Sequence, residues 1–316
     1  MSKLNIMWEY YDTIKSVPNN LWEKYISRNN VCLDKRLFAV CENMFPDTSF
    51  YYFIKGRPDA PEIIFPLMID NDTAETGTPE TSGRHFWYDN DKMDFMEFVR
   101  QSSEIIQNKF PDLKKIVYRD FNDNQPQPHN ISFLRALDVS ELIIPEKVKS
   151  MEEYVDTLRS KYKYQVKQYL NAVPRDRYSF YPESDYLPLL DELYPLYEDV
   201  CLRSTEYDAP PYPPEYFAAV KKEFGEQAVA LVVRDIEKDR ILGFMLLLYN
   251  DAACVHQYIG FERIDNLYLW HNLTLKSIED SICRGIRTVY MGVTNSIAKH
   301  KFGAVSRPNF FAELFI

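Results

Sequence analysis

Hydrophobic and polar positions form their clearest pattern in the second half of the chain. Three apolar runs of strand-like composition lie at residues 228–234, 241–249 and 253–260. Their connections are tight, which predicts an antiparallel meander of three strands. A long helix is expected over 268–284, because Gly285 stands at its C-cap position. A strand at 288–292, a short helical or irregular segment at 295–302 and a strand at 309–316 complete this half.

The first half has a similar but weaker pattern. Paired strands are expected at 49–55 and 62–69, followed by a long polar loop over 70–91. A helix is expected over 91–110, where Pro111 ends it, and further strands at 115–119 and 140–144. Shorter helices precede them at 22–27 and 37–44. The shared order of paired strands, long helix and strand suggests a weak internal duplication, although no residue-level repeat accompanies it.

A basic helical region joins the halves. Residues 146–173 carry an apolar stripe at helical spacing, and Pro174 ends it. Between Leu158 and Arg177 six cations stand against one acid, Asp176. The cations are Arg159, Lys161, Lys163, Lys167, Arg175 and Arg177. Such a cluster can neutralise several phosphates, and the alternative is a solvated face on an acidic protein.

Composition narrows the class of protein. Hydrophobic residues make up 46% and charged residues 27% of the chain, which is typical of a soluble globular protein. The net charge of −10 argues against a surface that is broadly basic for binding nucleic acid. A local basic patch is the remaining way to bind it. Five scattered cysteines without a CxxC pair argue against a disulfide framework or a metal site. No apolar run has the length of a membrane span, so a soluble, cytoplasmic protein is expected.

The segment Tyr290–Ala304 carries the most specific motif. Its strand ends in glycine, and a lysine is followed three residues later by an aromatic-Gly-Ala sequence. These places are filled by Gly292, Lys299, Phe302, Gly303 and Ala304. The segment resembles the closing part of the FemAB-like, peptidoglycan-biosynthesis branch of the GNAT (acyl-CoA N-acyltransferase) superfamily. The resemblance is clear in the last 60 residues and faint in the first 150, although segments 158–167 and 266–278 also resemble that branch.

The resemblance implies an α/β (α+β) fold of tandem GNAT-like subdomains, with a mixed central sheet flanked by helices. Residues 1–150 would form a degenerate N-terminal GNAT-like half, 151–177 a basic linking helix, and 178–316 the C-terminal GNAT-like domain. In this fold the strands before and after the long helix diverge and create a cleft for an acyl donor. The N-terminus of the helix then points its N–H groups at the donor's phosphates.

The stretch before the long helix departs from the acetyl-CoA pattern. Acetyl-CoA-using members carry [QR]xxGx[GA] there, so that the backbone can approach a pyrophosphate closely. Arg263 begins the stretch, but Asn266 and Tyr268 stand in the places of the small residues, and Asp265 adds negative charge. Fem-type transferases also lack this loop and take aminoacyl groups from charged tRNA. Acyl-CoA, a carrier thioester and aminoacyl-tRNA therefore stay open as co-substrates, and no bound cofactor is expected.

Four residues are the catalytic candidates. Lys299 would stabilise an oxyanion or hold a carboxylate or phosphate of the donor, unless it is a surface lysine beside Lys301. His271 opens the long helix and is either a general base or a core histidine. His256 and Tyr258 are expected on the same face of the third meander strand, as acceptor-site groups or as ordinary strand packing.

Donor- or acceptor-binding candidates lie in the basic helix and in three loops. They are Arg159, Lys163, Lys167, Tyr207, Tyr212, Arg263, Asn266 and Asn295. Tyr207 and Tyr212 would form an aromatic lid over an amine, unless their Pro-rich loop has no such role.

The function expected from these features is transfer of an acyl or aminoacyl group to an amine, with formation of an amide. No covalent enzyme intermediate is expected, because neither Ser204 nor any cysteine lies in a nucleophile context. The acceptor would be a small molecule or a peptide, and tRNA is a second candidate partner. Two alternatives stay open: a catalytically inactive GNAT-fold binding protein, and a GNAT-fold enzyme with another small-molecule reaction. The oligomeric state does not follow from the sequence.

Overall fold

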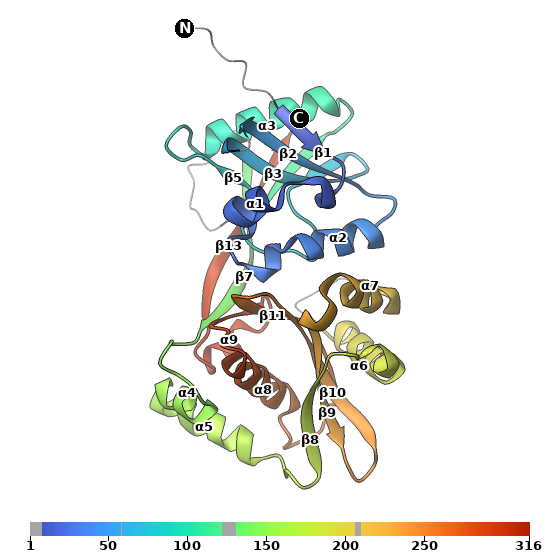
Figure 1. Ribbon diagram of the computed structural model, residues 1–316, viewed down its shortest axis with the longest axis vertical. Helices are drawn as coiled ribbons and strands as arrows, with labels where there is room; N and C mark the ends of the chain where they lie inside the picture. The colour runs from blue at the N-terminus through green and yellow to red at the C-terminus, as the bar shows by residue number, and fades with distance from the viewer. Residues whose placement is uncertain (1–7, 58, 122–130, 206–209) are drawn as a thin grey trace. The chain divides into compact units, whose positions relative to one another are not determined.

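The chain forms two compact units in the computed structural model, which describes residues 8–57, 59–121, 131–205 and 210–316 (Figure 1). The N-terminal unit contains Met1–Ala136 together with Pro308–Ile316, and the C-terminal unit contains Leu137–Arg307. The expected boundaries at 150 and 178 differ from this division. Residues 137–177 pack within the C-terminal unit, and the last nine residues, 308–316, pack within the N-terminal unit.

The sheet of the N-terminal unit has the strand order β1-β2-β3-β4-β6-β13. Neighbouring strands are antiparallel except β4 and β6, which run parallel and are connected through helix α3 (Phe95–Lys109). The strands are β1 (Trp8–Tyr11), β2 (Ser49–Arg57), β3 (Ala60–Asp70), β4 (Thr73–Glu75), β6 (Lys115–Phe121) and the later part of β13 (Val305–Phe315). A short strand, β5 (Trp87–Tyr88), pairs with β3. The prediction of a loop over 70–91 was wrong at β4 and β5, because such short strands show no alternating pattern.

Alternating residues of this sheet enter two cores. Phe53 on β2 packs with α3, whereas Tyr52 and Ile54 pack on the opposite face. That face is covered by short helices and α2 (Lys35–Met44), and Asp34 caps α2 by accepting a hydrogen bond from the N–H of Arg36. The short helices are η1 (Ile14–Ser16), α1 (Asn19–Leu21), the π-helix η2 (Trp22–Ser27) and η3 (Val31–Leu33). The period of two in the sequence therefore produces a sheet that is buried on both faces.

The sheet of the C-terminal unit has the order β7-β12-β11-β10-β9-β8. Strands β11 and β12 run parallel, and the other neighbours are antiparallel. The strands are β7 (Ile131–Ile143, of which the end lies here), β8 (Tyr178–Glu183), β9 (Ala228–Asp235), β10 (Arg240–Tyr249), β11 (Ala253–Phe261) and β12 (Thr288–Gly292). The predicted meander of three strands is confirmed as β9, β10 and β11. The edge strand β8 escaped prediction, because Pro182 and flanking polar residues obscure its pattern.

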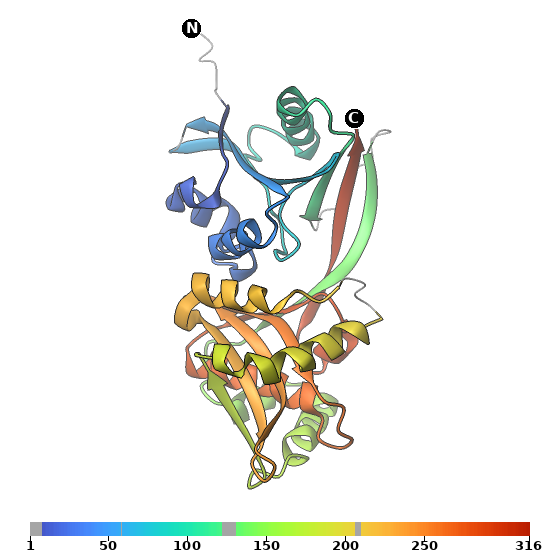
Figure 2. The same ribbon diagram turned by 90° about the vertical axis from the view of Figure 1, so that its right-hand side faces the viewer.

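Helices cover both faces of this second sheet (Figures 1 and 2). Helix α8 (Leu269–Cys283) packs on one face with α4 (Met151–Thr157) and α5 (Ser160–Asn171) against it, and the core of the unit lies there. Helices α6 (Leu190–Leu202) and α7 (Pro214–Phe224) pack on the other face. The remaining helices are η4 (Leu187–Leu189), η5 (Gly225–Gln227) and α9 (Ser296–His300). The long helix predicted over 268–284 is confirmed as α8.

The two units repeat one topological element. In each, a strand, a long helix and a parallel strand follow one another: β4-α3-β6 in the N-terminal unit and β11-α8-β12 in the C-terminal unit. An antiparallel strand then pairs with the second of these strands, β13 with β6 and β7 with β12. The pairing of β7 with β12 places segment 137–143 in the C-terminal unit, and the pairing of β13 with β6 places segment 308–316 in the N-terminal unit. The weak internal duplication is therefore present in the topology.

Candidate active site

Strands β11 and β12 pair over a short length only. Their parallel register covers Ala253–Val255 on β11 and Thr288–Tyr290 on β12. Strand β11 then continues to Phe261, whereas β12 ends at Gly292, whose φ of 77° lies in the left-handed region that glycine tolerates. The two strands therefore separate after Val255 and Tyr290.

A β-bulge interrupts the pairing of β11 with β10 at this point of separation. Leu246 pairs with Tyr258 but Leu247 pairs with His256, so Gln257 is the extra residue. An extra residue shifts the alternation of side chains by one position. The expectation that His256 and Tyr258 share a face was wrong for this reason: they point to opposite faces of the sheet.

His256 faces α8. Its Nε2 lies 2.8 Å from Oγ of Ser277, and that hydroxyl donates to the carbonyl oxygen of Thr274 at 2.7 Å. Since the serine proton is engaged, Nε2–H of His256 is the donor in the first contact. Burial, together with the ammonium of Lys299, lowers the pKa of His256 to about 3. The imidazole is therefore neutral at physiological pH and is a weak base.

Lys299 is buried at the end of β12. The residue is only 5% exposed. Its Nζ lies 3.9 Å from the position that a Cβ on Gly292 would occupy. The short helix α9 carries it, and the following Phe302 is fully buried against Trp270 at 5.7 Å. Lys299 is thus not the surface lysine of the alternative interpretation. A buried ammonium beside the separating strands is a suitable group to stabilise developing negative charge.

His271 lies in an aromatic surrounding. Its ring is 4.1 Å from that of Tyr169 on α5 and 6.0 Å from that of Phe302. Burial, with a contribution from Lys301, lowers the pKa of His271 to about 4. The packing corresponds to that of a core histidine, and the low pKa makes this imidazole a poor general base.

The loop before α8 keeps an unusual backbone. Asn266 and Tyr268 have φ angles of 68° and 49°, in the left-handed region. These are the two places where the acetyl-CoA motif has small residues, which adopt a left-handed conformation more readily. Tyr268 is 43% exposed, and its ring lies 5.0 Å from Tyr169. Arg263 and Asp265 are exposed in the same loop.

A buried amide secures this loop to the neighbouring helix. Nδ2 of Asn272 donates to the carbonyl oxygens of Leu267, Tyr268 and Tyr169 at 2.9, 3.3 and 3.0 Å. Asn295 repeats the left-handed conformation, with φ of 54°, at the residue before α9. Its backbone carbonyl accepts a hydrogen bond from the N–H of Lys299 at 3.2 Å, which joins the loop after β12 to the helix that carries the lysine.

Tyr258 faces α6 and α7, where aromatic rings gather. Its ring centroid lies 5.0 Å from Tyr197, 5.5 Å from Tyr216 and 6.0 Å from Tyr212. Tyr212 stacks on Tyr216 at 4.8 Å, and Nε2 of Gln257 donates to the hydroxyl of Tyr216 at 3.2 Å. The structure therefore brings Tyr212 and Tyr258 together on the face opposite His256.

Other predicted residues lie apart from this arrangement. Lys163 on α5 forms an ion pair with Asp156 on α4, and Lys167 is exposed farther along α5. Arg159 occupies the position just before α5. Tyr207 falls outside the described residues.

Three contributors to the site were not predicted from the sequence: Ser277, Gln257 and Tyr216. A signal for Ser277 existed, because Thr274, Ser277 and Ser281 interrupt the apolar pattern of α8 and are fully buried. The positions of Gln257 and Tyr216 depend on strand register and on the packing of α7, which no local pattern records.

Two further observations concern the described residues as a set. Among them, no group of three or more His, Cys, Asp or Glu side chains is arranged to hold a metal ion. None of the helices in the described ranges is long and apolar enough to cross a membrane.

No protein-family model matches the chain, and no curated protein matches it. Solved structures do match its fold. FemX is similar with a TM-score of 0.62 at 10% identity, over 88% of this chain and 90% of that chain. The C-terminal domain of a protein from Agrobacterium fabrum, described as a lysylphosphatidylglycerol synthetase, has a TM-score of 0.58 at 12% identity, over 93% and 90%. A tandem GNAT protein from the clavulanic acid biosynthesis pathway has a TM-score of 0.57 at 9% identity, over 98% of both chains.

These likenesses establish the class of fold. The chain has a tandem GNAT fold, with a mixed sheet flanked by helices, as expected from the sequence. At such low identities the similarity concerns the fold and does not extend to donor or acceptor.

Proposed function

We propose that the C-terminal unit transfers an acyl or aminoacyl group from an activated donor to an amine and forms an amide. One observation carries the proposal: the ammonium of Lys299 is buried where β11 and β12 separate. An ammonium in this place can stabilise the oxyanion that develops in acyl transfer. The names of the similar structures, FemX and the lysylphosphatidylglycerol synthetase among them, support a transferase of this kind.

The proposed reaction needs no covalent enzyme intermediate. The acceptor amine attacks the carbonyl carbon of a thioester or ester, so a C–N bond forms and the C–S or C–O bond breaks. The proton lost by nitrogen ends on the leaving thiol or alcohol. Lys299 and backbone N–H groups of β11 at the bulge would stabilise the oxyanion of the tetrahedral intermediate.

The roles of the two sheet faces would differ in this reaction. The pKa of about 3 makes His256 unsuited to deprotonate an amine, so its proposed role is to orient groups on the α8 face. Tyr258 and Tyr212 lie on the α6/α7 face, where aromatic rings suit an amine acceptor. Asn266, Arg263 and Asn295 are proposed donor-contacting groups, because they border the loops at the ends of the separating strands.

The test is a transfer assay with the full-length protein. Radiolabelled acetyl-CoA, a longer acyl-CoA and aminoacyl-tRNA are each offered with a panel of primary amines, and amide products are counted. The Lys299→Met variant should lose about 100-fold or more in kcat with any active pair, whereas the matched Lys301→Met variant should not. Equal activity of wild type and Lys299→Met would contradict the assignment of the lysine.

A GNAT-fold binding protein without catalysis is the second candidate. It is favoured by one observation: both imidazoles near the site, His256 and His271, have a lowered pKa and are poor bases. Retained donor binding with no amide product from any pair, in wild type and variants alike, would support this candidate over the transferase.

A further inference from the structure

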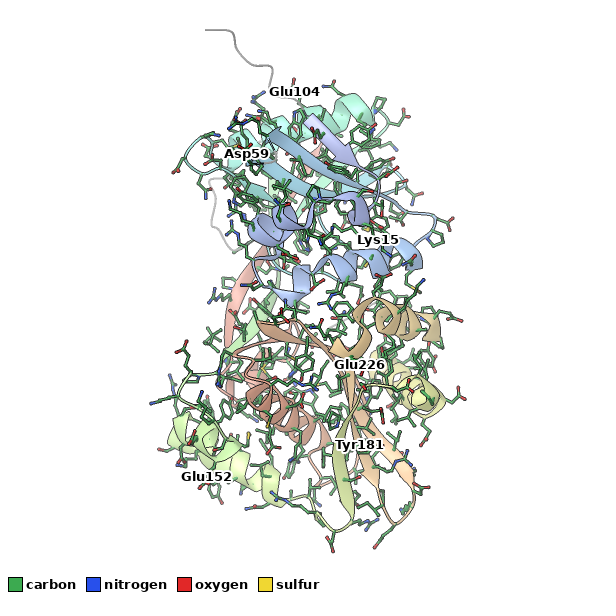
Figure 3. All side chains as sticks on the ribbon, in the orientation of Figure 1. Lys15, Asp59, Glu104, Glu152, Tyr181 and Glu226 are labelled. Atoms are coloured by element: carbon green, nitrogen blue, oxygen red, sulfur yellow. The ribbon has the colours of Figure 1, made fainter. Side chains whose placement is uncertain are left out.

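A cavity of about 260 Å³ lies on the side of α8 that faces away from the sheet. Helices α4 and α5 form its other walls, and Glu152, labelled in Figure 3, stands at its edge on α4. On α8, Leu275 and Glu279 turn to the cavity, whereas Ser277 turns to His256 on the sheet. The cavity and the separating strands are therefore on opposite sides of one helix.

The floor of this cavity is apolar. It is formed by Met151 and Val155 of α4, Leu170 of α5 and Leu275 of α8. Val155 and Leu275 belong to the buried core of the unit, so the floor is a fixed surface. The volume approaches the lower end of small-molecule pockets, about 300 Å³. An aliphatic group of a few carbons therefore suits this floor.

Two cations of the lining have no acidic partner in direct contact. Neither Lys167 nor Arg175 makes a hydrogen bond or ion pair with any residue in the described part of the chain. The charge of Lys167 contributes to lowering the pKa of Asp156, but the ion pair of that carboxylate is with Lys163. Both side chains are exposed at the cavity, so an anion bound there can reach them.

Two of the other charged residues of the lining cancel each other. Nζ of Lys276 lies 2.6 Å from a carboxylate oxygen of Glu279, so this pair contributes little net charge. Glu152 is the remaining acid against Lys167 and Arg175. The three cations and two acids of the lining therefore leave one net positive charge, in a protein whose net charge is −10.

We infer that this cavity binds an organic phosphate whose short aliphatic part lies on the apolar floor. A phosphate monoester carries close to two negative charges at neutral pH and matches two cations, and the guanidinium of Arg175 suits its oxygen geometry. A polynucleotide fits less well, because an apolar floor offers nothing to its neighbouring phosphates. This inference is independent of the proposed transferase activity, since it concerns the opposite side of α8.

The test is calorimetric titration of the full-length protein with hexyl phosphate, inorganic phosphate and hexanol. Hexyl phosphate should bind saturably and more tightly than either of the others. Lys167→Gln and Arg175→Gln should each weaken it roughly tenfold, which corresponds to about 1.4 kcal/mol. Lys161→Gln is the matched control, because Lys161 is exposed on the same helix and outside the lining. Leu170→Trp should abolish binding by filling the cavity while leaving every charge in place.

Several outcomes would overturn the inference. They are equal affinity for hexyl and inorganic phosphate, an equal loss in Lys161→Gln, or a short RNA that competes as tightly as hexyl phosphate. Two arms then identify the source of the phosphate. Vesicles that contain a phosphate-monoester lipid, compared with phosphatidylcholine vesicles, should be bound if the ligand is a lipid headgroup, and only the soluble ester should bind if it is a free metabolite.

Discussion

Nε2 of His256 lies 2.8 Å from the hydroxyl of Ser277, and this contact joins strand β11 to the sheet-facing side of α8. It depends on the bulge at Gln257, which leaves His256 on this face and turns Tyr258 to the other. The buried Lys299 acts electrostatically on the same imidazole. At the separation of β11 and β12 the charged group is therefore the ammonium, and the imidazole is neutral.

The first prediction concerns the titration of His256. Its pKa of about 3 is lowered first by burial and then by Lys299. Replacing Lys299 by methionine removes the second cause, so the pKa should rise but stay below the usual value of about 6.5. Histidine NMR titration of wild type, Lys299→Met and Lys301→Met measures this. An unchanged His256 pKa in Lys299→Met would mean that the ammonium lies too far away to act on the imidazole.

The second prediction concerns the left-handed backbone at Asn266. Alanine at a φ of 68° is strained by roughly 1 kcal/mol, whereas glycine is not. We expect Asn266→Ala to lower the free energy of unfolding by about 1 kcal/mol relative to Asn266→Gly. Urea unfolding of the two variants, which both lack the amide side chain, isolates the backbone effect. Equal stability would show that the loop relaxes to another conformation.

The third prediction concerns acid stability of the N-terminal unit. His85 is fully buried, its Nε2 lies 2.7 Å from Oγ1 of Thr81, and its Nδ1 lies 3.8 Å from a carboxylate oxygen of Asp120. Burial, together with the charge of Arg119, lowers the pKa of His85 to about 3. The unfolded chain, with a histidine pKa near 6.5, therefore binds more protons below that pH, and stability falls as pH falls.

The size of this acid effect follows from the linkage. Between pH 6.5 and pH 5 the His85 contribution should reduce the free energy of unfolding by about 2 kcal/mol. Burial raises the pKa of Asp120 above its ordinary value, so the folded chain binds a proton there more readily than the unfolded chain. This contribution raises the stability as pH falls, opposite to that of His85. In His85→Gln the loss over this range should therefore be smaller than in wild type. Urea unfolding at the two pH values measures it, and parallel losses in both proteins would contradict a neutral buried His85.

The fourth prediction concerns the close approach of α6 to β11. A Cβ on Gly260 would meet the backbone N of Tyr197 at 2.5 Å and the backbone C of Leu196 at 2.6 Å. Because these atoms cannot move aside alone, Gly260→Ala should displace the helix and cost about 3 kcal/mol. Gly285→Ala is the control: its Cβ meets nothing within 4 Å, and only its φ of 77° adds strain of about 1 kcal/mol. Equal losses in thermal unfolding would indicate that α6 is not packed this closely.

The sequence by itself determined most of the helices and strands, and it singled out one candidate residue. The spacing of apolar residues predicted the three-stranded meander, the long helix α8 and the strand that follows it, because these patterns depend on residues close in sequence. The motif that ends in Phe302, Gly303 and Ala304 also singled out Lys299. Lys299 is buried, as is Phe302 after the short helix that carries it, and the role of the lysine stays a prediction.

The tertiary structure determined which face of the sheet each side chain occupies and which strands pair. The bulge at Gln257 arises from the register of β11 against β10, so periodicity alone placed Tyr258 on the wrong face. The destinations of β7 and β13 depend on which strand edge is available at long range, which moved segments 137–143 and 308–316 between units. The ion pair of Lys163 with Asp156 also depends on the packing of α5 against α4. Lys167 and Arg175 line a cavity instead, which the sequence did not indicate. Local spacing determines what a segment can become, and contacts between distant segments determine the surroundings in which its side chains act.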